Sequence, residues 1–304
     1  MEHREPSLSR EPTILPMVSI ICVTFNRRDL ALRCLESCFR QDYPALEVIV
    51  LVNASNDGTD QAVRTKFPKA RLICTHKNIG IFPALNVGIA NATGYYVMNV
   101  DDDAHFIETN TITRLVRAFD QEPSLGAVAC NQEGPAETPI AGADRYVDTF
   151  TAGFTLLPRK VFTDWVGYYP DIFFRDAGET YISMALWEQG KPIKKLCQAR
   201  MYHERTMQGR SDWHWKFHGL RSQILVALMR EPWYLLAPSL LSKFFKSLIQ
   251  YIRWRYPLTW AHAWLSSLFH IPDALRHRFA ISWRTERILW RLRTDVVTDL
   301  AKLR

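Results

Sequence analysis

Short apolar runs alternate with helical segments over the first 130 residues, and this alternation limits the possible fold more than any other feature of the sequence. The runs are rich in Val, Ile and Leu and nearly continuous, which is typical of strands buried on both faces. Strands joined by helices predict an α/β fold, with a mostly parallel sheet and helices on both of its faces. The five runs are residues 18–25, 46–52, 70–76, 94–100 and 125–130.

Polar residues follow four of these predicted strands at the point where each strand ends. They are residues 24–27, 53–57, 77–78 and 101–103. Ligands of open parallel sheets bind outside the carboxyl ends of the strands. We therefore expect a ligand site at this edge of the sheet.

The fourth of these groups consists of three consecutive carboxylates, Asp101, Asp102 and Asp103. Adjacent carboxylates repel one another, and a hard divalent cation such as Mg²⁺ or Mn²⁺ removes that repulsion. In an extended chain residues i and i+2 point the same way, so Asp101 and Asp103 can face one ligand while Asp102 faces elsewhere. A solvated acidic loop is the alternative interpretation, and the position after a buried strand favours the ligand site.

The C-terminal part of the chain is basic and helical in pattern. Residues 210–304 contain 16 Lys and Arg against 6 Asp and Glu, a net charge of +10. This charge suggests an anionic lipid surface or nucleic acid as a partner. In 240–253 the basic residues lie opposite an apolar stripe, a pattern that favours a membrane surface or a protein interface over nucleic acid.

Five segments, residues 18–61, 78–106, 153–162, 173–190 and 199–203, resemble family 2 glycosyltransferases of the GT-A fold. Within that family they are most similar to a rhamnosyltransferase-like bacterial branch. The resemblance implies a GT-A type, Rossmann-like sheet with a C-terminal helical appendage. It also implies three regions. These are a flexible N-terminal arm (1–16), a nucleotide-sugar-binding catalytic domain (17–209) and a basic amphipathic helical region (210–304).

The resemblance further implies an inverting transfer from a UDP- or dTDP-linked sugar to a glycan or lipid-linked acceptor. It assigns Mn²⁺ or Mg²⁺ to Asp101, Asp103 and His203, with Asp101 and Asp102 also at the donor. Val52 stands where relatives carry an acid that holds the base. Arg205 and Arg210 are candidates to cover the diphosphate. The other expected donor-binding residues are Thr24, Asn26, Arg27, Asn53, Asp57, Asn78 and Asn86.

An inverting transfer needs a carboxylate base that deprotonates the acceptor hydroxyl. Relatives carry a Glu-Asp pair at the start of the helix predicted over 178–190, and here the pair reads Glu179-Thr180. Glu179 is the expected base, with Asp176 as the alternative. If relatives use the second acid, Thr180 cannot replace it, and Asp176 is then the substitute. A separate alternative, suggested by Thr180, is a nucleotide-sugar-binding protein of this fold that is catalytically impaired.

The N-terminal sixteen residues lack the apolar core of a signal peptide, and six scattered cysteines show no zinc-type spacing. We expect a cytoplasmic protein, either free or peripheral on the cytoplasmic face of the inner membrane. The C-terminal helices would make the membrane contact or a dimer. A dinucleotide-binding oxidoreductase is excluded because no Gly-x-Gly-x-x-Gly turn follows the first strand. We expect no nucleic acid as a partner.

Overall fold

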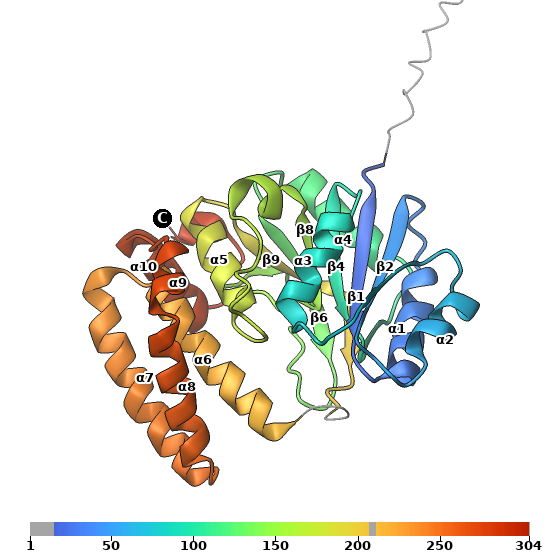
Figure 1. Cartoon of the computed structure of the whole chain (residues 1–304). Helices are drawn as coiled ribbons and strands as arrows, with labels where there is room; N and C mark the ends of the chain where they lie inside the picture. The colour runs from blue at the N-terminus through green and yellow to red at the C-terminus, as the bar shows by residue number, and fades with distance from the viewer. Residues whose placement is uncertain (1–14, 207–210, 304) are drawn as a thin grey trace, which may run out of the picture.

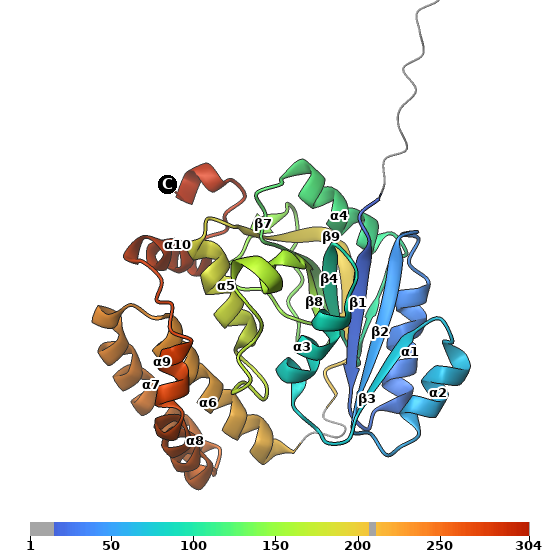
Figure 2. The same ribbon diagram turned by 45° about the horizontal axis from the view of Figure 1, so that its top comes forward.

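A computed structural model describes residues 15–206 and 211–303, so most of the predicted N-terminal arm lies outside the described residues. Within the described ranges nine strands form one mixed sheet (Figures 1 and 2). Its order is β3-β2-β1-β4-β8-β6-β9-β5, and β7 pairs with β9. The strands are β1 (Val18–Thr24), β2 (Leu46–Asn53), β3 (Arg71–Thr75), β4 (Tyr96–Asp101), β5 (Ala104–Phe106), β6 (Ala127–Glu133), β7 (Arg145–Tyr146), β8 (Phe154–Pro158) and β9 (Ile193–His203).

The strands β3, β2, β1 and β4 run parallel, and helices connect them in the order expected from the sequence. Right-handed crossovers place α1 (Arg28–Phe39) and α2 (Thr59–Lys66) on one face of the sheet and α3 (Ile81–Asn91) on the other. The predicted α/β fold is confirmed. Beyond β4 the sheet becomes mixed, since β8 is antiparallel to both β4 and β6.

Two short strands escaped the sequence patterns. β5 has three residues, and β7 lies inside the stretch 131–149, which reads as a polar connection. Both pair with the long strand β9. Pairings of two or three residues are set by the partner strand rather than by a local pattern.

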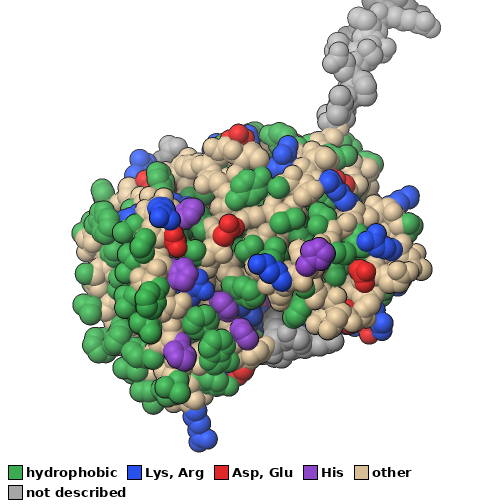
Figure 3. Space-filling view, viewed as in Figure 1, with side chains coloured by type: hydrophobic (Ala, Val, Ile, Leu, Met, Phe, Trp, Pro, Cys, Tyr) green, Lys and Arg blue, Asp and Glu red, His purple; other side chains and the backbone are tan. Residues whose placement is uncertain are grey.

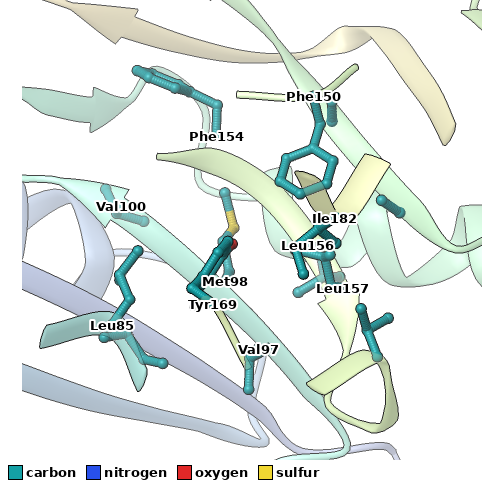
Figure 4. Packing of buried hydrophobic residues seen from close by; sticks show 14 of the residues in the cluster. Leu85, Val97, Met98, Val100, Phe150, Phe154, Leu156, Leu157, Tyr169 and Ile182 are labelled. Carbon is teal, nitrogen blue, oxygen red and sulfur yellow. The ribbon is translucent and has the colours of Figure 1, made fainter. Parts of the chain in front are cut away.

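The core beneath the strand ends is closely packed (Figure 4). Met98 and Val100 of β4 are paired with Leu156 and Phe154 of β8. Ile182 belongs to the same cluster of buried side chains. Each of these side chains is almost fully buried. Burial of one such side chain contributes roughly 1.5–3 kcal/mol. The sheet is therefore a rigid support for the residues that follow β4.

The C-terminal region is helical, as expected. α6 packs on α5 and against α7, α8 and α9, while α10 also contacts α5 (Figure 1). Arg230, at the end of α6, is buried between α5 and the segment before α10. The helices are α4 (Thr111–Gln121), α5 (Gly178–Glu188), α6 (Asp212–Arg230), α7 (Trp233–Arg253), α8 (Pro257–Phe269), α9 (Ile271–Arg276) and α10 (Trp283–Thr294), with a π-helical turn η1 (Val161–Trp165) and a 3-10 turn η2 (Leu300–Leu303).

The helix α7 presents its two faces in an unusual way. Leu241, Phe245 and Ile252 are 57–60% exposed, while Lys243 and Lys246 line a cavity between α7 and α6. These three apolar side chains are thus exposed, while Lys243 is half-buried and Lys246 is itself exposed. None of the helices within 15–206 and 211–303 is long and apolar enough to cross a membrane.

Candidate active site

A cavity of about 620 Å³ opens at the carboxyl ends of β1, β2 and β4. The segment that leads into α5 closes its other side. The cavity brings together polar residues from widely separated parts of the chain, as the strand-end pattern predicts. Eight of the predicted site residues line it: Thr24, Arg27, Asn53, Asn78, Asp101, Asp102, Asp176 and Glu179.

Asp101, Asp103 and His203 converge at the end of β4. One ligand atom from each of these side chains lies within 4.8 Å of the others. The pairing of β5 with β9 produces this arrangement, because Ala104 is opposite His203. Nε2 of His203 lies 3.4 Å from Oδ1 of Asp103. The resemblance assigned these three residues to one site, and the structure brings them together although His203 is about a hundred positions from the aspartates.

The grouping of Asp101 with Asp103 matches the expectation, but the reason differs, because β4 ends at Asp101 and a turn at residues 102–103 leads into β5. Asp102 contacts Arg27 instead. Its Oδ1 accepts a hydrogen bond of 2.9 Å from Nη1 of Arg27, which also lies 3.3 Å from Oδ2 of Asp103. Arg27 is only 4% exposed, and its Nη2 donates to the carbonyl oxygen of Thr206 at 2.9 Å. Arg27 therefore offsets the charge of two carboxylates, a role that the sequence did not reveal.

The protonation of Asp102 is balanced between opposing effects. Burial raises its pKa to about 6, the positive charge of Arg27 opposes the rise, and the negative charge of Asp103 adds to it. A pKa of about 6 leaves this carboxyl group mostly ionised at neutral pH, so Arg27 is needed to offset its charge beside Asp103.

Glu137 holds His203 from its other side. The two residues meet through Nδ1 and Oε1 at 3.1 Å, and the same oxygen accepts a hydrogen bond of 2.8 Å from Nε of Arg205. Burial lowers the pKa of His203, but the contact with Asp103 and the charges of Asp101 and Glu137 outweigh it, so the pKa lies above its ordinary value. Arg205 is thus engaged with Glu137, while Arg210 lies outside the described residues.

The three converging side chains suit a divalent cation. Carboxylate oxygens and an imidazole nitrogen are ligands that Mn²⁺ accepts. In the part of the chain that the structure describes, the buried Nε2 of His203 has no hydrogen bond of good geometry. A carboxylate on the other ring nitrogen is the usual support of a metal-binding histidine. Gly153 also leaves room, because a Cβ there would lie 2.3 Å from the Asp101 carboxyl carbon.

Asn53 organises the end of the cavity where the nucleotide base was expected. Its Nδ2 donates to Oδ1 of Asn78 and to the carbonyl oxygen of Gly80, and its Oδ1 accepts from the backbone N–H of Ile79. Val52 is 2% exposed within β2 and does not line the cavity. The amide of Asn53 is therefore used within the protein, where it positions Asn78 at this end of the cavity.

Three expected donor-binding residues lie outside the cavity lining. Asn26 accepts a hydrogen bond from the backbone N–H of Asn56, which joins the loops after β1 and β2. Asp57 accepts from the backbone N–H groups of Arg28 and Thr59, at the starts of α1 and α2. The amide of Asn86 bonds to both backbone groups of Tyr169. Each of these residues shapes the loops around the cavity.

The start of α5 supplies the acids on the far side of the cavity. Asp176 and Ala177 have φ values of 59° and 65°, a backbone conformation that residues other than glycine rarely adopt. This bend directs Glu179 into the cavity, whereas Thr180 does not line it. Burial raises the pKa of Glu179 to about 7, and the negative charges of Asp176 and Asp101 act in the same direction.

A close backbone contact joins the loop after β3 to the segment before α5. Ile81 N–H donates to the carbonyl oxygen of Phe174 at 2.8 Å. Gly80 has φ +91°, and a Cβ there would lie 2.5 Å from the same oxygen. Only glycine permits this approach.

Several lining residues had no recognisable signal in the sequence. They come from β4, α3, the segment before α5 and the start of α6, and no spacing in the sequence identifies them. These residues include Asn99, Phe82, Phe174, Arg175, Ser211 and His214.

Comparison with known proteins connects this cavity to a family. The family model described as glycosyl transferase family 2 matches residues 19–177. Chondroitin synthase of Pasteurella multocida (strain Pm70) is 27% identical over 203 residues, 62% of this chain and 21% of that protein. An N-acetylglucosaminyltransferase of Bradyrhizobium elkanii is 32% identical over 126 residues, 40% of this chain and 68% of that protein. The chain spans about a fifth of the length of chondroitin synthase and of hyaluronan synthase from the same genus.

Solved structures share the fold. The mannosyltransferase PcManGT from Pyrobaculum calidifontis, in complex with GDP-Man and Mn²⁺, has a TM-score of 0.57 and 19% identity over 99% of this chain and 82% of its own. TarS 1-349 of S. aureus, in complex with UDP-GlcNAc, has a TM-score of 0.61 and 17% identity over 91% of this chain and 87% of its own. These likenesses confirm the GT-A fold.

The family match begins within β1 and ends at the residue before α5. It covers the strand ends and the three aspartates, and it amounts to more than half of the chain. The rhamnosyltransferase-like branch stays a prediction. At the level of the family the resemblance seen in the sequence is confirmed, and the chain belongs to glycosyl transferase family 2.

Proposed function

We propose that this protein transfers a sugar from a nucleoside-diphosphate donor to a hydroxyl group of a glycan or lipid-linked acceptor. The transfer inverts the anomeric carbon and requires Mn²⁺ or Mg²⁺. The observation that carries the proposal is the arrangement of one cavity, with Asp101 of the Asp101–Asp103–His203 cluster on one side and Glu179 on the other. Solved relatives contain GDP-Man with Mn²⁺ or UDP-GlcNAc, which supports a nucleotide-sugar donor.

The chain's own residues perform three tasks in this reaction. Asn78 offers its Nδ2 amide group to a uracil or thymine ring, while Asn53 holds the Asn78 side chain in place, in keeping with a UDP- or dTDP-linked donor. Glu179 accepts the proton of the acceptor hydroxyl while the hydroxyl oxygen attacks the anomeric carbon. The bond from that carbon to the diphosphate breaks on the opposite face, so the configuration inverts. A cation held by Asp101, Asp103 and His203 would supply a Lewis acid for the departing diphosphate.

Glu179 is a better base than Asp176 in this geometry. The carboxylate of Asp176 is already engaged with Nε of Arg175 at 2.8 Å. Glu179 has a pKa of about 7, close to the value that suits a base at neutral pH. Because Thr180 lies outside the lining, its lack of an acid does not remove the base.

The relatives and the surface suggest where the reaction takes place. Curated relatives include chondroitin synthase, hyaluronan synthase and a poly-beta-1,6-N-acetyl-D-glucosamine synthase, so we place the reaction in cell-surface polysaccharide or glycolipid synthesis. We further propose a cytoplasmic location, peripheral on the cytoplasmic face of the inner membrane.

Exposed apolar side chains on α7 and α8 support the membrane contact. In Figure 3 hydrophobic side chains gather over these two helices. Leu258 and Phe269 at the ends of α8 are each 75% exposed, and Trp233 at the start of α7 is 66% exposed. The region also has a net charge of +10, which attracts an anionic bilayer.

Thermal unfolding with nucleotides tests the donor site. UDP, dTDP and GDP should be compared, each with and without Mn²⁺, because a ligand that binds only the folded state stabilises it. At a hundred times its Kd a ligand adds about 2.7 kcal/mol to the free energy of unfolding. We expect a nucleoside diphosphate to raise the melting temperature, with a larger rise in Mn²⁺.

The variant Asp103→Asn provides the matched comparison for the metal. It keeps the size of the side chain, and we expect it to lose the extra stabilisation from Mn²⁺. No shift with any nucleoside diphosphate would refute the donor site. Binding of UDP-sugars without turnover on any acceptor would identify the chain as an impaired nucleotide-sugar-binding protein.

A further inference from the structure

A second cavity of about 360 Å³ lies between α6 and α7. It borders the catalytic cavity, because Asp176 lines both. The residues of α6 in its wall include Trp215 and Lys216, and those of α7 include Lys243 and Lys246. Trp254, just after α7, completes this wall.

Two tryptophans give the second cavity an aromatic wall. Trp215 and Trp254 are each 40% exposed. Both are held in place by the ammonium group of Lys216, which lies 5.6 Å and 5.4 Å from their ring centroids. Aromatic rings that are fixed and partly open to solvent offer an apolar surface on which the C–H face of a sugar ring can pack.

The basic residues of the cavity differ in how far their charges are already balanced. Lys216 pairs with Asp212 at 2.6 Å, and Lys243 pairs with Glu231 at 2.9 Å. Lys246 forms no ion pair with residues 15–206 or 211–303. Its charge is therefore available to an anionic ligand, with Lys243 close to it one helical turn earlier.

A glycine keeps the second cavity open beside Asp176. Gly219 of α6 has only one heavy atom near the position that a Cβ would take, namely Oδ2 of Asp176 at 3.5 Å. Asp176 precedes Glu179 by three residues. A ligand in the second cavity therefore lies next to the segment that carries the base.

We propose that the second cavity is the acceptor subsite, and that it binds a sugar ring bearing an anionic group, such as a phosphate, diphosphate or carboxylate. The proposal rests on the transferase function proposed above. The tryptophans pack against the ring, Lys246 binds the anion, and the acceptor hydroxyl reaches Glu179 past Gly219. Acceptors that carry a lipid diphosphate and acidic glycans share this chemistry.

Binding of glucose 1-phosphate tests the subsite without any turnover. The protein is first saturated with UDP and Mg²⁺, so that the donor site cannot bind the probe. Saturation-transfer NMR then compares glucose 1-phosphate with uncharged methyl glucoside and with inorganic phosphate. We expect glucose 1-phosphate to bind more tightly than either, because only it offers both the ring and the anion.

Charge reversal of the free lysine provides the decisive comparison. Lys246→Glu should weaken glucose 1-phosphate binding about tenfold or more, as expected for loss of a charged contact. Lys69→Glu makes the same change at an exposed position in the connection between α2 and β3, and should bind as the wild type does. Equal binding by Lys246→Glu and wild type would overturn the proposal. So would equal binding of glucose 1-phosphate and inorganic phosphate.

Two further arms separate related explanations. Gly219→Leu should weaken probe binding by filling the space beside Asp176, whereas Gly219→Ala adds one methyl group at an ordinary contact distance and should not. If Lys246→Glu instead loses binding to phosphatidylglycerol vesicles while it keeps glucose 1-phosphate, the lysine contacts lipid headgroups and the proposal fails. The UDP-induced rise in melting temperature reports the donor site in every variant, so failure of the subsite is distinguishable from failure of the transferase function.

Discussion

At the scale of single residues, Glu179 has a carboxyl group whose pKa is raised from 4.5 to about 7 by burial and by the charges of Asp176 and Asp101. The protonated form is therefore favoured in the folded protein. This contribution to stability is complete below pH 4.5 and is lost as the pH rises through about 7. Catalysis requires the opposite form, so the active protein keeps a less stable state of this residue at neutral pH.

The pH dependence of transfer follows from this pKa. We expect kcat/KM to rise with pH up to about 7 and then to level off. The positive charge of a bound cation moves the midpoint to lower pH. Glu179→Gln should reduce kcat about 10²- to 10⁴-fold and abolish this rise.

Asp176→Asn is the matched comparison, because it changes the acid three residues earlier. It should keep the rise in kcat/KM with pH. If the rise persists in Glu179→Gln and disappears in Asp176→Asn, then Asp176 is the base.

Glu137 provides a second test at this scale, since it contacts Nδ1 of His203. Carboxylates in this position orient the ring and increase its basicity toward a metal. Glu137→Gln should lower Mn²⁺ affinity about 10- to 100-fold in a direct Mn²⁺ titration. Glu133→Gln, which alters a nearby carboxylate paired with Arg200, should leave the affinity unchanged. If Glu137→Gln binds Mn²⁺ as tightly as Glu133→Gln does, then Glu137 has no part in metal binding.

The aspartates and Glu137 show how far the sequence predicts a site. A polar site after the buried strand that ends at Asp101 could be predicted from local pattern, whereas the turn at residues 102–103 that brings Asp103 beside Asp101 could not. Glu137 lies in a loop whose course is fixed by contact with β9, where Gly134 approaches the carbonyl oxygen of His203. No local pattern encodes that contact. The same holds for Arg27, whose charge is used inside the protein.

At the scale of elements, Arg230 joins three segments around a buried guanidinium group. Cζ of Arg230 lies 3.7 Å from the ring centroid of Tyr181, and the guanidinium group donates to the carbonyl oxygens of Tyr181 and Phe279 at 3.1 Å each. These contacts connect the end of α6 with α5 and with the segment before α10. Burial lowers the pKa of Arg230, so the fold bears the cost of a charge with no carboxylate partner among these contacts.

Replacement of Arg230 should therefore be strongly destabilising. Arg230→Met leaves two buried carbonyl groups without donors, and we expect a loss of about 2–4 kcal/mol in the free energy of unfolding. Urea denaturation measures this loss. Arg276→Met, at a side chain that is 76% exposed, should change stability by less than about 0.5 kcal/mol. A similarly small effect in Arg230→Met would contradict the role of this residue.

Helices and strands differ in how well the sequence predicted them. The long apolar strands and the helix ending near Gly190 were predictable, because burial on both faces or on one stripe leaves a clear pattern. The orientation of α7 was not. Its apolar stripe suggests which residues share a face, but Lys243 and Lys246 line a cavity against α6, which supplies Trp215 and Gly219 on the other side. Which face a helix buries depends on its neighbours.

At the scale of the whole molecule, α7 and α8 form an apolar surface in a basic region. The protein should sediment with vesicles that contain phosphatidylglycerol, and less so as salt rises, since charges are screened beyond about 10 Å at 0.1 M. The double variant Leu258→Glu/Phe269→Glu should lose this binding without a lower melting temperature, because both side chains are 75% exposed.

Tyr168→Glu, at another exposed aromatic residue, is the control for this experiment and should bind vesicles normally. Dimerisation is the competing use of the surface. Sedimentation velocity distinguishes the two. A dimer that the double variant dissociates, together with no binding to vesicles, would show that the surface joins two copies of the chain.

The contact between Gly80 and Phe174 has a consequence for how the two substrates affect each other's binding. Asn53 bonds to Gly80, and Phe174 is two residues from Asp176, so the wall for the nucleotide and the wall shared by both cavities are in direct contact. If two ligands both favour the same arrangement of this contact, each changes the affinity of the other by the same factor, whichever binds first. A donor that tightens acceptor binding must itself be held more tightly once the acceptor is bound. The protein would then retain its donor longest when a productive partner is present.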